Sequence, residues 1–133
     1  MTKNKLVVIG GSDAGISAGL RARELSSDTE VTMILADRYP NFSICGLPFY
    51  LSGEISDWKT LAHRTIGEIE EKGIQLCPDH RVTAIHPDRK VVLATDGEGR
   101  NRSFAYDKLL IGTGGVSLVP NLPGIDLPGV FFL

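Results

Sequence analysis

The first 35 residues carry the hydrophobic pattern of a strand, a helix and a second strand. The β-branched run from Lys5 to Ile9 is typical of a buried strand, and it ends at a pair of glycines. From Ala14 to Leu25, small and large apolar residues recur at helical spacing, which predicts a helix with one face against a sheet. The stretch from Glu30 to Leu35 alternates polar and apolar residues and predicts a second strand. This order is typical of a mononucleotide-binding βαβ unit.

The rest of the chain predicts shorter elements. After a loop-rich stretch, the capping box Thr65-x-x-Glu68 opens a short helix that runs to about Lys72. Apolar runs then predict four strands, at residues 74–76, 82–85, 91–94 and 104–106. The simplest arrangement is an antiparallel meander inserted after the helix. A further buried-type run at 108–111 ends in glycine-rich residues 112–115, where bare backbone can approach a ligand.

Composition and charge narrow the function classes. A chain of 133 residues with 42% hydrophobic residues can bury one modest core, so it is one domain or part of one. The net charge of −2 gives no basic excess that would favour nucleic acid or a membrane surface. The first apolar run is far shorter than the roughly 20 residues of a membrane span. With two cysteines and no secretory signal, we expect the cytoplasm, and no metal-ligand spacing is present.

The turn GGSDAG at residues 10–15 carries most of a dinucleotide-binding fingerprint. Gly10 and Gly15 keep the first and last glycines of G-x-G-x-x-G, whereas Ser12 stands in the place of the middle glycine. Gly10 permits the tight turn, Gly15 lets the helix pack on the strand, and the N–H groups of the helix start can receive a pyrophosphate. The alternative is a glycine-bearing turn with no ligand.

Cys45, within the stretch SICGLPFY at residues 43–50, is a candidate nucleophile. It stands at the predicted start of a helix, where backbone N–H groups stabilise a thiolate. The alternative is a small residue that only packs, and the residues alone leave both interpretations open. Cys77 follows a predicted strand, and we expect a structural role for it. We expect solvated rather than catalytic side chains at the three histidines, His63, His80 and His86.

Four landmarks in order give the chain a resemblance to a known family. They are VVIGGSDAG at 7–15, FSICGLPFYLSGE at 42–54, YDKLLIGTGG at 106–115 and PNLPGIDLPGV at 120–130. Together they resemble the pyridine nucleotide-disulfide oxidoreductases, in particular the branch with a single redox cysteine. That branch includes coenzyme A-disulfide reductase, NADH oxidase, NADH peroxidase and NADH-dependent persulfide or polysulfide reductase. The resemblance covers the whole chain.

The resemblance implies a fold and a set of site residues. The fold is α/β, a partial Rossmann-like FAD-binding domain with a parallel sheet and an inserted antiparallel β-meander. The activity is that of an FAD-dependent NAD(P)H oxidoreductase acting on a disulfide, persulfide, peroxide or oxygen. Cys45 falls at the place of the flavin-facing redox cysteine. The residues implied to bind FAD are Gly10, Gly11, Ser12, Ala14, Gly15, Asp37, Val82, Thr113 and Gly114.

Two departures from the family pattern bear on ligands. Many relatives end the second strand in a glutamate that holds the FAD ribose, whereas this chain has Leu35 there and its nearest acid is Asp37. Asp37 either substitutes for the glutamate or is a surface loop residue. Coenzyme A-using relatives often carry an arginine pair in the first helix and an asparagine before the cysteine. This chain has Arg23-Glu24 and Ile44 at those places, which argues against coenzyme A as the substrate.

Full-length relatives continue into an NAD(P)H-binding domain, a second flavin motif and a dimerisation domain. We therefore expect residues 1–133 to be the N-terminal segment of a homodimeric flavoenzyme with a small-molecule substrate, inactive by itself. The apolar residues 130–133 have the pattern of an interrupted strand. Two alternatives stay open, a free-standing flavin- or nucleotide-binding module and a structural partner without catalysis. The terminal electron acceptor and the choice between NADH and NADPH also stay open.

Overall fold

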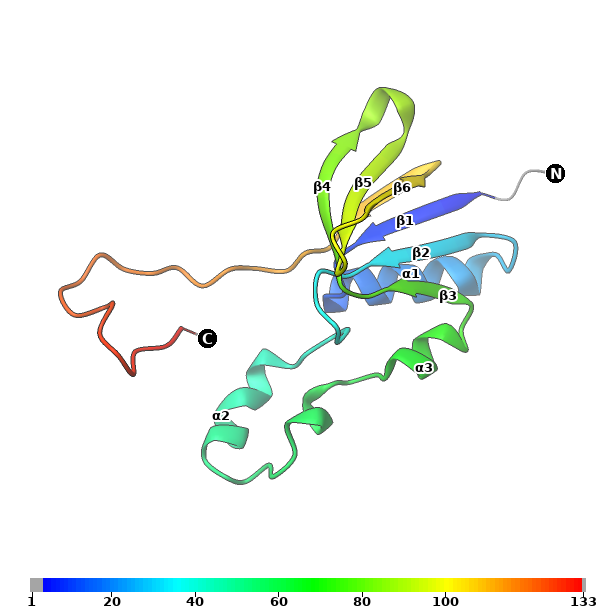
Figure 1. The fold of residues 1–133 in the computed structure, drawn as a ribbon. Helices are drawn as coiled ribbons and strands as arrows, with labels where there is room; N and C mark the ends of the chain where they lie inside the picture. Colours follow the sequence, from blue (N-terminus) through cyan, green and yellow to red (C-terminus); the bar gives the residue numbers. More distant parts are fainter. Residues whose placement is uncertain (1–3, 133) are drawn as a thin grey trace.

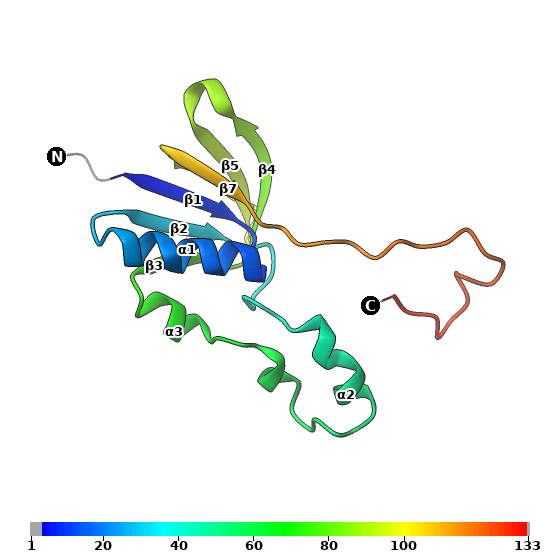
Figure 2. The same ribbon diagram turned by 180° about the vertical axis from the view of Figure 1, so that it is seen from behind.

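A computed structural model describes residues 4–132 and shows an α/β fold built on a four-stranded parallel sheet (Figure 1). The strand order is β3-β2-β1-β7, and β1 pairs in parallel with both β2 and β7. The helix α1 (Asp13–Leu25) lies across one face of this sheet (Figure 2). The predicted βαβ unit is therefore confirmed. The four strands are β1 (Lys5–Ile9), β2 (Glu30–Ile34), β3 (Ile74–Cys77) and β7 (Lys108–Ile111).

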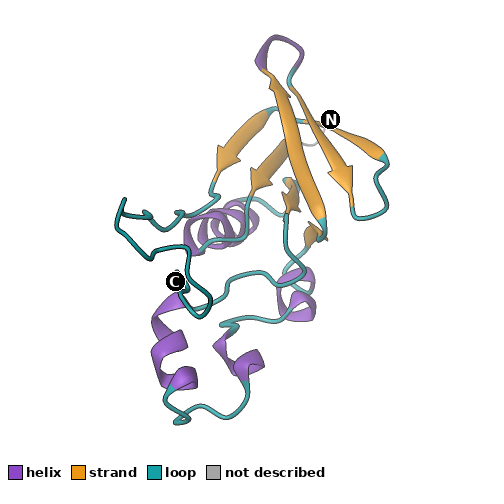
Figure 3. Cartoon of the chain, turned by 60° about the vertical axis from the view of Figure 1, so that its left-hand side comes forward, coloured by secondary structure: helices purple, strands orange, loops and turns teal. Residues whose placement is uncertain are grey.

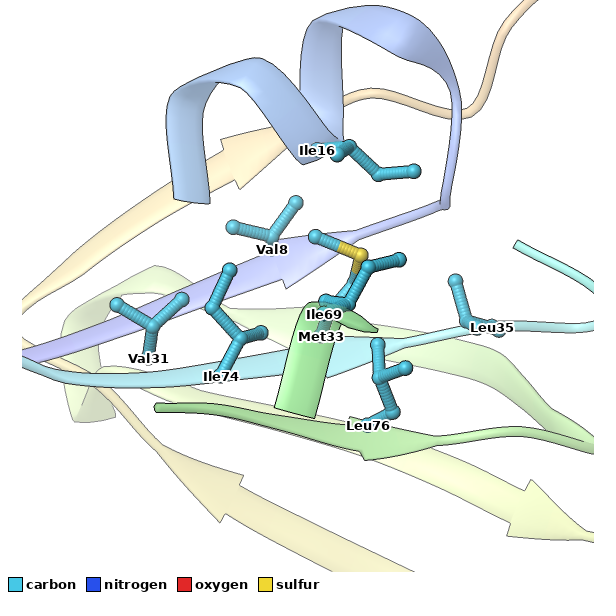
Figure 4. Close-up of a cluster of buried hydrophobic side chains, with 8 residues drawn as sticks. All are labelled: Val8, Ile16, Val31, Met33, Leu35, Ile69, Ile74 and Leu76. Carbon is cyan, nitrogen blue, oxygen red and sulfur yellow. The ribbon is translucent and has the colours of Figure 1, made fainter. Parts of the chain in front are cut away.

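One core fills the space between the sheet and its helices. A Cβ at Gly19 of α1 would lie 3.2 Å from the Cδ1 of Ile74, so the small residue lets the helix approach the sheet closely. The helix α3 (Ile66–Glu70) buries Ile69 in the same core, and its predicted capping box is formed. Figure 4 shows the eight buried residues of this cluster: Val8, Ile16, Val31, Met33, Leu35, Ile69, Ile74 and Leu76.

A second, antiparallel sheet covers the opposite face. It contains β4 (His80–His86), β5 (Val91–Asp96) and β6 (Asn101–Ala105), with the short helix η3 (Pro87–Arg89) between the first two. Its buried residues pack on the outer side chains of the parallel strands in a cluster of Val7, Ile9, Ile34, Val92 and Ala94. The chain thus has three layers, helices, parallel sheet and meander.

The expected place of the strand at 74–76 is wrong. It was predicted within the meander, but β3 pairs in parallel with β2, with Val31 opposite Ile74 and Met33 opposite Leu76. Ile74 and Leu76 are both buried in the core under α1 and α3. Pairing with β2 extends the apolar face that these helices cover, whereas a place in the meander would leave that face shorter.

Two segments extend away from the layers. Residues 41–64 form an arm with the short helices η1 (Ile44–Gly46), α2 (Leu47–Leu51) and η2 (Trp58–Leu61), which lie apart from the strands in Figure 3. Residues 116–132 form a tail that contains no helix or strand (Figure 1). The strand expected near the end is therefore not formed at 130–132, and Leu133 lies outside the described residues. Among residues 4–132, no helix has the length and apolarity needed to cross a membrane.

Asp96 at the end of β5 provides a test of the meander. Its carboxylate accepts hydrogen bonds from the backbone N–H of Arg100 at 2.9 Å, the guanidinium of Arg100 at 2.9 Å and the backbone N–H of Glu98 at 3.1 Å. The backbone hydrogen bond from Arg100 is the main cause that holds the pKa of Asp96 below its ordinary value. Because the folded pKa is depressed, this stabilisation is complete above the ordinary pKa and is lost as the pH falls through the folded value.

We expect Asp96→Asn to lower the free energy of unfolding at neutral pH, with a difference from the parent that shrinks below about pH 4. Urea unfolding across a pH series measures this difference. Among residues 4–132, the Asp88 carboxylate in η3 has no comparable set of hydrogen bonds. Asp88→Asn is therefore the matched control and should leave the pH profile unchanged. A difference between Asp96→Asn and the parent that is constant down to pH 2 would contradict the account.

Candidate functional site

The carboxyl ends of β1 and β7 meet at Gly10 and Gly112, which lie so close together that a side chain would not fit. The N–H of Gly10 donates to the carbonyl of Ile34 at 2.8 Å, and the N–H of Gly112 donates to the carbonyl of Ile9 at 2.7 Å. Gly10 has a φ of +96°, and a Cβ there would overlap the carbonyl group of Gly112. A Cβ at Gly15 would overlap the carbonyl oxygen of Gly10. The first and last glycines of the fingerprint therefore hold the strand ends and α1 together.

Ser12 caps α1 at this point. Its hydroxyl accepts from the N–H of Gly15 at 3.4 Å, and its carbonyl accepts from the N–H of Ile16 at 2.9 Å. The first N–H groups of a helix have no partner within the helix, and with the helix dipole they favour an anion. Ser12, which stands in the place of the middle glycine, thus caps α1. The two residues before it, Gly10 and Gly11, carry no side chain.

A cleft of about 370 Å³ opens beside these groups. Of the nine residues predicted to bind FAD, seven line it: Gly10, Gly11, Ser12, Asp37, Val82, Thr113 and Gly114. The other two, Ala14 and Gly15, lie in α1 behind the lining. Gly15 is buried where the helix crosses the strand end, and Ala14 is exposed. The structure therefore brings together residues from four separate parts of the chain at one edge of the sheet.

The residue directly after β2 is apolar, whereas dinucleotide-binding folds often have an acidic residue near this place. Leu35 is 2% exposed, and its side chain belongs to the core cluster of Figure 4. Asp37 is exposed and lines both the cleft and an adjoining cavity of about 410 Å³. That second cavity also contains the ion pair between Arg38 Nε and Asp79 Oδ2, at 3.2 Å. Asp37 is thus placed at the cleft, and its contact with a ribose stays a prediction.

Cys45 lies in η1, directly before α2, and is exposed. It does not line the cleft itself, but its neighbour Ile44 does. The N–H of Ser43 donates to the carbonyl of Leu61 at 2.9 Å, and a Cβ at Gly46 would press against the side chain of Leu61. Leu61 of η2 therefore fixes the cysteine loop, while the Cys45 thiol stays exposed. The aromatic rings of Tyr39 and Phe42 pack on Trp58 at centroid distances of 5.1 and 6.0 Å and support the same loop.

Cys77 has a different setting. It ends β3, is half-buried and does not line the cleft. Burial raises the pKa of the Cys77 thiol, and the nearby Arg102 guanidinium offsets only part of this effect. Within residues 4–132, no three His, Cys, Asp or Glu side chains are placed to hold a metal ion.

The sequence analysis missed several cleft residues, of which His80 is the most informative. We expected a solvated side chain, but His80 is partly buried, lines the cleft and has its Nδ1 2.6 Å from the carbonyl oxygen of Pro78. Asn41 was missed as well; it adopts a φ of +54° while its N–H donates to the carbonyl of Gly11 at 2.9 Å. The cleft is also lined by residues that were not predicted to bind a ligand: Ile9, Ile34, Leu35, Ala36, Tyr39, Phe42, Ile44 and Arg81.

Known proteins share this sequence and fold. The chain is 34% identical over 131 residues to the NADH oxidase of Lactococcus lactis subsp. cremoris, which covers 97% of the chain and 29% of the relative. The water-forming NADH oxidase from Lactobacillus brevis bound to NADH superposes with a TM-score of 0.84 at 32% identity, over 92% of this chain and 28% of that one. The NAD-dependent persulfide reductase from A. fulgidus gives a TM-score of 0.86 at 31% identity, over 94% and 24%.

The chain thus spans less than a third of the length of these relatives. The family model described as pyridine nucleotide-disulphide oxidoreductase matches residues 4–133, which is nearly the whole chain. The chain belongs to the pyridine nucleotide-disulphide oxidoreductase family.

Proposed function

We propose that residues 1–133 form the N-terminal part of an FAD-binding domain in an NAD(P)H oxidoreductase, and that the cleft holds the adenosine and pyrophosphate half of FAD. The observation that carries this proposal is the cleft at the carboxyl ends of the parallel strands, lined by seven of the nine residues predicted for FAD. In open α/β sheets, nucleotides bind in the crevice outside these strand ends.

The residues present fit such a group. A pyrophosphate needs close backbone approach and N–H donors, and the cleft offers Gly10 and Gly11 beside the start of α1 and Gly114 after β7. The tight packing of Gly10 on Gly112 keeps side chains out of this cradle. Asp37 and Val82 line the side of the cleft where β2 ends and β4 begins, which suits the adenosine.

Cys45 supplies the redox chemistry in this proposal. When bound, FAD would carry the two electrons of a hydride between NAD(P)H and the sulfur of Cys45. The exposed thiolate of Cys45 can attack a disulfide to form a mixed disulfide as a thiolate leaves, or take the outer sulfur of a persulfide as a thiolate leaves. Peroxide would oxidise it to a sulfenate with release of water, and oxygen as acceptor would first have to take two electrons from NAD(P)H, by way of FAD, to become peroxide. The names NADH oxidase and persulfide reductase among the relatives support this range of acceptors.

Coenzyme A is not favoured by the first helix. The Arg21 guanidinium pairs with Glu24 at 3.0 Å. The Arg23 guanidinium donates to the backbone carbonyls of Ser27 at 2.6 Å and Thr29 at 2.7 Å, so it ties the end of α1 to the following turn. Both side chains already have partners within the chain, which leaves them poorly placed for the phosphates of coenzyme A.

Exposed apolar side chains favour a larger enzyme over a free-standing module. Leu51 of the arm is 70% exposed, and Val116 and Phe131 of the tail are 95% and 85% exposed. A free-standing module would keep these side chains in water, whereas soluble monomers seldom expose large contiguous apolar patches. We therefore propose that the nicotinamide site and the homodimer contacts lie outside residues 1–133.

The first test is the binding of FAD. The cleft holds one half of the cofactor, so a polypeptide of residues 1–133 should bind FAD weakly and lose it on desalting. Flavin absorbance of the desalted protein after incubation with excess FAD measures the retained fraction. A stoichiometric yellow protein would contradict the view that much of the flavin site lies elsewhere, and binding of no FAD at any concentration would contradict the proposed cleft.

The second test compares the two thiols. We expect limiting iodoacetamide to label Cys45 at least about tenfold faster than Cys77, because Cys45 is exposed whereas burial shields Cys77 and raises its pKa. Peptide mass spectrometry at short reaction times gives both rates in one sample. Equal rates after unfolding in urea provide the control, and faster labelling of Cys77 in the folded chain would contradict the assignment.

A further inference from the structure

We propose that His80 is a ribose-binding residue of the nucleotide cleft, and that its imidazole replaces the carboxylate that is missing at position 35. This inference rests on the proposed function. The ligand group is a ribose hydroxyl of the adenosine half of the cofactor, and the chemistry is a hydrogen bond accepted by the Nε2 atom of His80.

The backbone places His80 beside the end of β2. Its N–H donates to the carbonyl of Leu35 at 2.7 Å, so the two residues are direct neighbours across the strand ends. In dinucleotide folds, the ribose hydroxyls are held by an acidic side chain near the end of the second strand. Both residues line the cleft, but the Leu35 side chain is apolar and buried in the core, whereas His80 carries an imidazole. His80 therefore brings a polar group to the place that Leu35 leaves apolar.

The surroundings fix the tautomer of the ring. Nδ1 lies 2.6 Å from the carbonyl oxygen of Pro78. A carbonyl only accepts, so Nδ1 carries the hydrogen, and in the neutral ring Nε2 is then an acceptor. Within residues 4–132, Nε2 has no hydrogen-bond partner. A ribose hydroxyl in the cleft is a donor that matches it.

The ring is also held in place. His80 packs edge-on against Phe104 of β6, with ring centroids 6.1 Å apart and an interplanar angle of 71°. An acceptor fixed by a hydrogen bond on one side and a ring contact on another loses little freedom when a ligand binds. The two acidic residues nearby, Asp79 and Asp37, are less suited to accept a hydrogen bond from the ribose. Asp79 is already paired with Arg38, and the exposed Asp37 must be ordered on binding.

The experiment measures the affinity of residues 1–133 for ADP, 2′-deoxy-ADP and 3′-deoxy-ADP by isothermal titration. We expect the parent chain to bind at least one deoxy analogue about three- to tenfold more weakly than ADP, the effect of one hydrogen bond. His80→Phe keeps a ring against Phe104 but removes the acceptor, so ADP should bind as weakly as that analogue. His80→Gln retains a side-chain acceptor and should recover part of the discrimination. Asp37→Asn tests the competing carboxylate. His86→Phe, at the other end of β4 and outside the cleft lining, is the matched control and should discriminate as the parent does.

The outcomes separate this inference from the function on which it rests. Binding of ADP with discrimination that survives His80→Phe, or that disappears in Asp37→Asn instead, overturns the role of His80 and leaves the nucleotide cleft standing. Equal affinity of the parent for all three nucleotides also overturns the role of His80 and leaves the nucleotide cleft standing. Binding of none of them overturns both proposals. Circular dichroism of each variant establishes folding, and if His80→Phe fails to fold, His80→Gln and the parent still decide the matter.

Discussion

Gly10→Ala should lower the free energy of unfolding by about 3 kcal/mol and weaken ADP binding by about tenfold or more. Two costs add up at this position. A residue with a Cβ is strained at a φ of +96°, and its Cβ would overlap the carbonyl group of Gly112 and the Cα of Thr113. Both neighbours are backbone atoms at the end of β7, so the strand ends must move apart, and the cleft opens at its floor.

Gly99→Ala separates the two costs. Gly99 has a φ of +79°, but a Cβ there has no atom within 4 Å. We therefore expect Gly99→Ala to lower the free energy of unfolding only by the conformational cost of about 1–2 kcal/mol, and to leave ADP binding unchanged. Urea unfolding and titration of both variants measure the two effects. Equal losses of stability in the two variants would show that the close approach of Gly10 and Gly112 contributes nothing.

The second large effect is the absence of turnover. We expect a polypeptide of residues 1–133 to oxidise NADH no faster than free FAD does. Hydride transfer to a flavin and onward to the sulfur of Cys45 requires reacting groups held within near-attack distance, and a misplacement of about 1 Å already costs on the order of a hundredfold. The chain spans less than a third of the length of its relatives, and the cleft is proposed to hold only half of the flavin cofactor.

NADH consumption would be followed with added FAD and with oxygen, peroxide, coenzyme A disulfide or polysulfide in turn. Cys45→Ser serves as the matched control because the exposed side chain changes by one atom. A rate well above that of free FAD that disappears in Cys45→Ser would contradict the expectation. Such a result would mean that these 133 residues, by association of copies, complete an active site.

Much of the fold could be predicted because its signals are local. The strand, glycine turn, helix and second strand of the first 34 residues follow from periodicity, and the capping box of α3 follows from its spacing. The place of β3 could not be predicted in this way. Its short run of alternating residues is compatible with either sheet, and only the burial of Ile74 and Leu76 under the helices decides between them.

The candidate site was predictable where a residue type has one dominant use. Glycines such as Gly10 serve turns and close approaches. The order of the landmarks singled out Cys45, which the structure shows to be exposed and whose redox role stays a prediction. His80 could not be found because its position depends on the fold. It reaches the cleft only because the second sheet begins directly against the end of β2, through the hydrogen bond from its N–H to the carbonyl of Leu35. No sequence pattern around His80 predicts that contact.

The central claim is that the cleft at the strand ends binds the adenosine pyrophosphate of FAD, and backbone NMR of residues 1–133 tests it most directly. On titration with ADP, the amide resonances of Gly10, Gly11, Thr113 and Gly114 should shift together, while that of Gly99 at the far turn of the meander stays unchanged. FAD should shift the same amides. Shifts that map to the meander or to the tail, or no shifts at any ADP concentration, would contradict the account.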